Sequence, residues 1–232
     1  MTALTMALAG LLAGPLLHAL GVQSGTDLPL RPFESPCPRC PGTGWTIRCS
    51  CGRSRWRELA TGLTAAFGAG FVAAAIGWTP VLAAHMALVA VTTILIVSDL
   101  DHLRIPNRIL YPGGFACLVL LTAGALASGR WSDLIRGLVA GVAYWGLFLL
   151  VWLAARGKGF GFGDVRLAAL LGLFLGFHSW RVLVWGLFVT ALAGGVPAIV
   201  LLMRGKSRTT LLPYGPPLIV GTWVALALVG RL

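Results

Sequence analysis

Of the seven acidic residues in this 232-residue chain, three stand in two motifs beside long apolar segments. Asp99 and Asp101 follow the apolar run 90–97, and Asp164 comes between Gly161-Phe162-Gly163 and another apolar segment. Carboxylates at a membrane boundary are costly to keep, so they are often functional. Each could instead be a helix-end aspartate solvated by water and headgroups. Asp164 could also serve only as a cap at a helix N-terminus.

Two of these aspartates could form an acid–base pair if they lie at the same membrane face. Neighbouring carboxyl groups in a low dielectric do not both ionise readily, so they share a proton and their titrations separate. One carboxylate then activates a water molecule while the other carboxyl donates a proton to a scissile carbonyl oxygen. The glycines before Asp164 carry no side-chain bulk, so we expect room there for a peptide backbone. A pair of this kind could activate water for attack on a carbonyl group, such as that of a peptide bond.

Four of the five cysteines fall in the segment 22–57, at Cys37, Cys40, Cys49 and Cys51. Two thiolate pairs separated by eight residues can close a tetrahedral zinc site, although the second pair has one intervening residue where two are usual. A small segment gains much of its folding energy from such a metal. We predict structural zinc; two disulfides or a redox-active thiol pair are the alternatives. The fifth cysteine, Cys117, is expected to be a small core residue.

The elements that must position these residues are long apolar segments. Hydrophobic residues make up 57% of the chain and charged residues 11%, whereas a soluble domain carries about 25% charged residues. Several segments reach the roughly 20 residues that cross a bilayer. We predict an all-α polytopic transmembrane helix bundle with eight spans at 3–21, 58–77, 79–98, 108–128, 132–154, 165–177, 180–203 and 211–230.

The predicted organisation has three parts. Residues 1–21 form a first transmembrane helix, which we expect to be retained because it lacks a positive N-terminal region and a clear cleavage site. Residues 22–57 form a cysteine-rich segment too small to bury a large core. Residues 58–232 form the remaining helical unit.

The positive residues predict the orientation of the spans. When 22–57 is placed on one side and the spans alternate from there, that side receives 14 of the 18 Lys and Arg residues. Cytoplasmic loops carry an excess of these residues, so this side is predicted to be cytoplasmic and both termini to face outward. Asp99 and Asp164 then lie at the cytoplasmic face. The net charge of +11 is spread over short loops, so we predict contact with a lipid bilayer and none with nucleic acid.

At the aspartates the sequence resembles the type IV prepilin peptidases, a family of Gly-x-Gly-Asp membrane aspartyl proteases. The family pattern places an aspartate seven residues before a proline that is followed by an acidic or amide residue, here Asp99, Pro106 and Asn107. Its second motif reads here Gly161-Phe162-Gly163-Asp164-Val165-Arg166-Leu167. The cysteine segment and the following Arg55-Trp56-Arg57-Glu58-Leu59 are also similar, and the resemblance covers roughly residues 37–230.

The resemblance implies a function and a cellular location. Asp99 and Asp164 would be the catalytic pair, whereas Asp101 and His102 would be neighbours without a catalytic role. The enzyme would sit in the bacterial inner membrane and remove the short basic leader of a prepilin or pseudopilin at the cytoplasmic face.

Methylation is a separate question. Many members of the family also methylate the new N-terminus with S-adenosylmethionine. This chain has a shortened cysteine loop and no Gly-rich strand–helix fingerprint for that cofactor, so we predict cleavage without efficient methyl transfer.

Two other classes of function stay open at this point. A proton- or cation-coupled transporter could use Asp99 and Asp164, but it would be expected to have carboxylates deep within its spans and repeated broken helices. A membrane scaffold could bind a partner through the cysteine segment, but it would not need two aspartates in this order.

Overall fold

The fold was analysed in a computed structural model that describes residues 1–24, 54–157, 161–203 and 214–228. Over these residues the backbone forms helices and no strand, as the all-α prediction requires. The helices are α1 (Thr2–Ser24), α2 (Ser54–Ile76), α3 (Leu82–His102), α4 (Asn107–Ala127), α5 (Trp131–Ala154), α6 (Phe162–His178), α7 (Trp180–Met203) and α8 (Gly215–Ala227).

The helices correspond one to one with the predicted spans but differ in length. Judged by length and hydropathy within the described residues, α1 to α5 can each cross a membrane. In contrast, α6 and α8 have 17 and 13 residues, fewer than the roughly 20 that span a bilayer. The protein is therefore a multi-pass helical membrane protein in which two short helices lie among longer ones.

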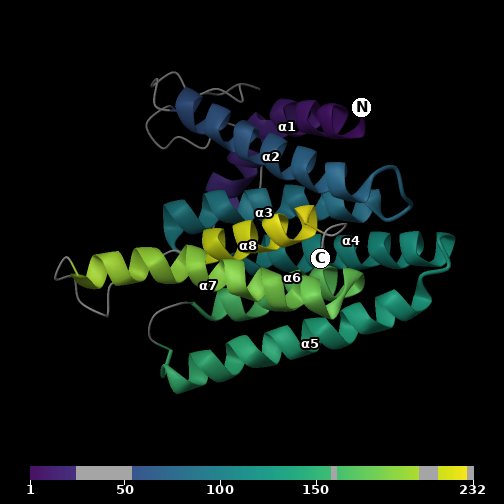
Figure 1. Cartoon of the computed structure of the whole chain (residues 1–232). Helices are drawn as coiled ribbons and strands as arrows, with labels where there is room; N and C mark the ends of the chain where they lie inside the picture. The colour runs from purple at the N-terminus through teal and green to yellow at the C-terminus, as the bar shows by residue number, and fades with distance from the viewer. Residues whose placement is uncertain (25–53, 158–160, 204–213, 229–232) are drawn as a thin grey trace.

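The short helices occupy the interior. In Figure 1, α8 lies between α3 and α6, and α5 lies at the outer edge beyond α6. The α6 side chains are buried on nearly every side, including the fully buried Leu171, Phe174 and Leu175. A helix that is apolar and buried all round is enclosed by other helices. Cys117 of α4 is completely buried as a free cysteine, which confirms its prediction as a core residue.

Close helix pairs flank this interior. A Cβ atom on Gly14 of α1 would stand 2.5 Å from Cα of Gly62 of α2, and one on Gly141 of α5 would stand 2.9 Å from the Ala169 carbonyl oxygen of α6. Small residues let membrane helices approach closely, because packing rather than water exclusion joins them. The pair α1–α2 also packs on α3, through Leu17, Ala65 and Ile94, so the first helix belongs to the same bundle as the rest.

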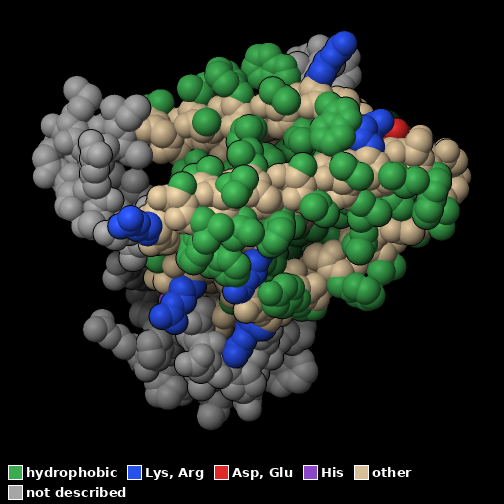
Figure 2. Space-filling view, turned by 90° about the horizontal axis from the view of Figure 1, so that it is seen from below, with side chains coloured by type: hydrophobic (Ala, Val, Ile, Leu, Met, Phe, Trp, Pro, Cys, Tyr) green, Lys and Arg blue, Asp and Glu red, His purple; other side chains and the backbone are tan. Residues whose placement is uncertain are grey.

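The surface has the distribution expected for contact with lipid. Figure 2 shows apolar side chains over most of one face, with a few separate Arg side chains among the described residues. Large apolar residues such as Phe115, Val142 and Leu150 are about two-thirds exposed. In water such a surface would drive association, whereas in a bilayer it faces acyl chains.

Candidate active site

The fold brings Asp99 and Asp164 together at one end of the bundle. Asp99 lies near the C-terminus of α3 and Asp164 in the first turn of α6, and only 5% and 4% of their surfaces are exposed. The two carboxyl groups are close enough to interact electrostatically. They are called here the carboxyl pair.

A backbone N–H group holds each carboxyl group in place. Gly215 N–H donates to Oδ2 of Asp99 at 3.0 Å, and Gly161 N–H donates to Oδ2 of Asp164 at 3.0 Å. The second bond closes the first turn of α6, so Asp164 does act as a cap through this oxygen. Its other oxygen, Oδ1, is buried and has no hydrogen-bond partner among the described residues. Buried polar atoms are rarely left unpaired, which makes this oxygen a candidate to bind a ligand.

The start of α8 is a part of the site that the sequence did not predict. Gly215 is the first residue of α8, and a Cβ atom there would stand 2.8 Å from Oδ2 of Asp99. The N-terminus of a helix also presents its free N–H groups and positive dipole end to an anion. The sequence Gly215-Pro216-Pro217 signals a helix start, but it does not indicate which carboxylate the helix faces.

Tyr214 precedes this helix and faces the same site. It interacts electrostatically with Asp164, and its ring lies 6.5 Å from that of Phe148 on α5. The ring also fills the space over Gly194 of α7, where a Cβ atom would stand 2.6 Å from it. Tyr214 and Gly215 therefore place the start of α8 beside both carboxyl groups.

Asp101 and His102 have other partners. The Asp101 carboxylate forms an ion pair with Arg57 of α2. His102 Nε2 lies 3.0 Å from the carbonyl oxygen of Val22 of α1. These two contacts hold the end of α3 against α1 and α2. They thereby position the last turn of α3, which carries Asp99.

The two aspartate motifs contact one another directly. The guanidinium group of Arg166 donates to Oδ1 of Asn107 and lies over the Phe162 ring, 4.6 Å from its centroid. A Cβ atom on Gly163 would stand 2.8 Å from Cβ of Ile105. We expected the glycines before Asp164 to leave room for a peptide, but the space beside Gly163 is filled by Ile105. This glycine instead allows the segment after α3 to pack against the start of α6.

The predicted zinc ligands Cys37, Cys40, Cys49 and Cys51 lie outside the described residues. Among the residues that are described, no group of three or more His, Cys, Asp or Glu side chains is placed to hold a metal ion. Zinc therefore remains a prediction from the sequence.

Comparison with known proteins gives a consistent result. The type IV leader peptidase family matches residues 86–201, a segment that contains both aspartate motifs. The chain is 32% identical over 171 residues to a prepilin leader peptidase/N-methyltransferase of Stutzerimonas stutzeri, covering 73% of this chain and 56% of that protein. The proteins of the same name from Pseudomonas aeruginosa and Myxococcus xanthus are each 30% identical, covering 73% and 86% of this chain.

These matches cover only part of each relative, 56% of the Pseudomonas protein and 64% of the Myxococcus protein. No solved structure matches the chain. The family match extends over half of the chain and includes both members of the carboxyl pair. The chain therefore belongs to the type IV leader peptidase family.

Proposed function

We propose that this protein is an intramembrane aspartyl endopeptidase and that Asp99 and Asp164 are its catalytic residues. The observation that carries the proposal is the carboxyl pair itself. Two aspartates 65 residues apart in the sequence are buried together at one end of a membrane bundle, and each is held by a backbone N–H group. A transporter or a scaffold would not require this pairing within the motifs that define a peptidase family.

The arrangement supports different roles for the two carboxyl groups. Each carboxyl group accepts one backbone N–H at the start of a helix, but Oδ1 of Asp164 is also buried without a partner among the described residues, which favours the protonated form of Asp164. Asp99 would therefore take a proton from the attacking water. Asp164 would carry the shared proton on the unpaired Oδ1 and donate it to the carbonyl oxygen of the scissile bond. As the tetrahedral intermediate collapses, the C–N bond breaks and the amine takes up from Asp99 the proton that the water lost. The carbonyl oxygen returns its proton to Asp164 as the C=O bond re-forms.

The substrates that fit are prepilins or pseudopilins with a short basic leader and an apolar stem. The proposed cut falls where the stem enters the membrane, because Asp164 lies at the start of α6 and Asp99 at the end of α3. The charge asymmetry of the loops supports a cytoplasmic position for this end in a bacterial inner membrane. Residues 1–21, 22–57 and 58–232 would then be the first helix, a cytoplasmic cysteine-rich segment and the peptidase unit.

Co-expression with a candidate prepilin tests the function. The host should lack its own leader peptidase, and leader removal is scored by a mobility shift and by mass spectrometry of the product. The wild-type chain should remove the leader, whereas an Asp164→Asn variant at the same membrane level should not. Equal processing by both would exclude the carboxyl pair as the catalytic site, and no processing of a panel of prepilins and pseudopilins would exclude the proposed activity.

A further inference from the structure

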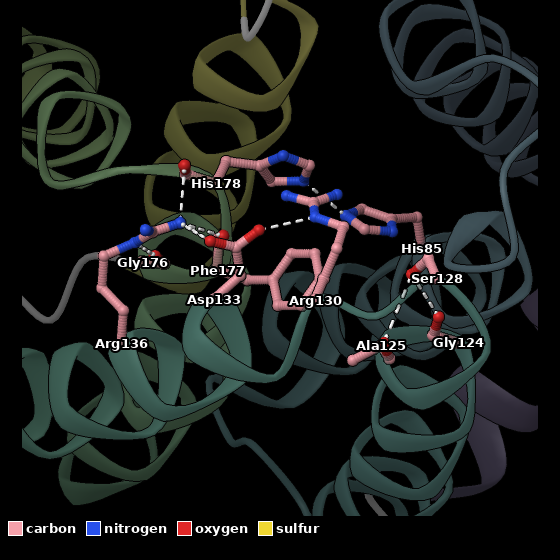
Figure 3. Close-up of polar contacts among 10 residues, drawn as sticks. All are labelled: His85, Gly124, Ala125, Ser128, Arg130, Asp133, Arg136, Gly176, Phe177 and His178. Carbon is pink, nitrogen blue, oxygen red and sulfur yellow. Dashed lines mark hydrogen bonds and ion pairs between the residues drawn. The ribbon is translucent and has the colours of Figure 1, made fainter.

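A second pair of like side chains joins α3 and α6 at the opposite end of the bundle from the carboxyl pair. His85 of α3 and His178 of α6 place their Nε2 atoms 2.9 Å apart (Figure 3). His85 is completely buried, and its Nδ1 lies 2.8 Å from the Val81 carbonyl oxygen. Since a carbonyl only accepts, Nδ1 of His85 carries the proton and its Nε2 is an acceptor. His178 must then donate through Nε2.

The spacing on the two helices relates this hydrogen bond to the carboxyl pair. On α3, His85 and Asp99 are 14 residues apart, and on α6, Asp164 and His178 are also 14 residues apart. Fourteen residues make almost four turns and about 21 Å of helix, so each histidine lies on nearly the same helix face as its aspartate. The two helices are thus joined by the histidine hydrogen bond at one end and carry the carboxyl pair at the other.

Neighbouring groups make the histidine end rigid. The ring of His85 packs edge-to-face on Phe174 of α6, with 5.0 Å between centroids. Arg136 of α5 donates to the carbonyl oxygens of Gly176, Phe177 and His178, which closes the C-terminus of α6 (Figure 3). Helix C-terminal carbonyls otherwise lack partners within the helix.

Charge also favours the uncharged form of both rings. Asp133 forms ion pairs with Arg130 and Arg136. These ion pairs hold the two guanidinium groups beside the end of α6. Arg130 lies over the Phe177 ring, 4.4 Å from its centroid. A positive charge on His178 would face both arginines, and one on His85 would face Arg130, so the hydrogen bond between neutral rings is the arrangement that fits this environment.

We propose that His85 and His178 are positioning residues for the peptidase, because their hydrogen bond sets the axial register of α3 against α6 and with it the separation of Asp99 and Asp164. This inference rests on the proposed function. A rigid helix transmits an axial shift along its whole length, and a misplacement of about 1 Å can cost two orders of magnitude in rate. The pair at one end would thus act on chemistry about 21 Å away.

Matched variants of His178 test the proposal. His178→Gln keeps an N–H donor for His85, whereas His178→Leu removes it. We expect His178→Leu to lower kcat by about tenfold or more with KM within about twofold, and His178→Gln to retain most of the wild-type kcat. Ser128→Ala is the control, because it removes a nearby hydrogen bond to the Gly124 carbonyl that does not join α3 to α6. Rates are expressed per folded molecule. If His178 only stabilised the fold, kcat per folded molecule would be the same in all variants.

A second measurement does not depend on cleavage. Cysteines replacing Asp99 and Asp164 are joined by a short bifunctional thiol reagent, and the 99–164 cross-link is located by mass spectrometry. Adding His178→Leu should slow this cross-link severalfold, and adding His178→Gln should not. Equal cross-linking and equal kcat in all variants would overturn the positioning role while leaving the proposed function intact. If the wild-type chain cleaves no prepilin, the proposed function is wrong. The cross-linking rates then test by themselves whether the histidine pair sets the register of α3 against α6.

Discussion

At the scale of single residues, the two oxygens of Asp164 have different environments. Oδ2 accepts the Gly161 N–H that closes the first turn of α6, while Oδ1 is buried without a partner. The cap and the catalytic interpretations of Asp164 are therefore compatible. Their consequences on substitution differ, because a cap can be replaced by another acceptor, whereas an acid–base group cannot.

Asp99→Asn and Asp164→Asn should each abolish nearly all cleavage. Both changes keep size and a hydrogen-bond acceptor, so membrane protein levels should hardly fall. Loss of a positioned acid or base costs roughly 10²–10⁴-fold in rate. The double variant should be little worse than either single variant, because residues that act as one unit are not additive. The measurement is leader cleavage normalised to the amount of membrane protein.

Asp101→Asn provides the control for this series. Asp101 pairs with Arg57, and because an amide oxygen at this position can still accept the Arg57 hydrogen bond, Asp101→Asn should keep the end of α3 in place and retain substantial activity. An inactive Asp101→Asn beside an active Asp99→Asn would move the proposed site from Asp99 to Asp101. Cleavage by Asp164→Asn at the wild-type rate would leave Asp164 with only its capping role.

Gly215→Ala should impair catalysis with little effect on folding of the bundle. The added Cβ would stand 2.8 Å from Oδ2 of Asp99, so either the carboxylate or the start of α8 must move. We expect kcat to fall by about tenfold or more through this displacement. Gly146→Ala on α5 is the matched control, because nothing lies within 4 Å of its added Cβ. It should keep full activity, and equal activity of the two variants would argue against a role for Gly215.

At the scale of the elements, the end of α3 is anchored to two other helices. Arg57 of α2 pairs with Asp101, and the Val22 carbonyl of α1 lies beside His102. The sequence between α1 and α2 contains the four clustered cysteines. The cysteine-rich segment is therefore joined at both its ends to helices that fix the position of Asp99.

If Cys37, Cys40, Cys49 and Cys51 form one tetrahedral site, the purified protein should carry about one zinc ion per chain. Cys40→Ser should then lower the zinc content and the expression level, because a small segment depends on its metal for folding. Elemental analysis of protein purified without oxygen gives the stoichiometry. Two disulfides per chain with no metal would favour the disulfide alternative instead.

At the scale of the whole molecule, the orientation in the membrane follows from charge. Reporter fusions of a phosphatase that is active only outside the cytoplasm should be inactive after Lys206 and active after Arg130. An active fusion after Lys206 would reverse the orientation and place the carboxyl pair at the outer face.

The reaction product tests whether this chain also transfers a methyl group. Several relatives carry N-methyltransferase in their names, and they are matched over only about half to two-thirds of their length. We predict cleavage without efficient methylation for this chain, measured by the mass of the mature pilin N-terminus. A fully methylated product that depends on this chain alone, with S-adenosylmethionine as donor, would contradict the prediction.

The sequence by itself determined the positions and type of the helices. A bilayer has no water to satisfy backbone groups, so each crossing segment must be apolar and helical, and that signal is local. The predicted spans 165–177 and 180–203 divide within two residues of the observed break between α6 and α7, and the sequence placed Asp99 and Asp164 at helix ends. The two aspartate motifs also led to the family before any three-dimensional information was used.

Only the tertiary structure decided which helices meet. Asp99 is bonded to Gly215, 116 residues away, and His85 to His178, 93 residues away. It also showed that Ile105 fills the space beside Gly163 and that the short helices α6 and α8 lie inside the bundle. Lipid is as apolar as the helix surfaces, so hydropathy alone does not determine which helices pack against one another. Shape, small residues and a few polar contacts make that selection, and these act between segments far apart in the sequence.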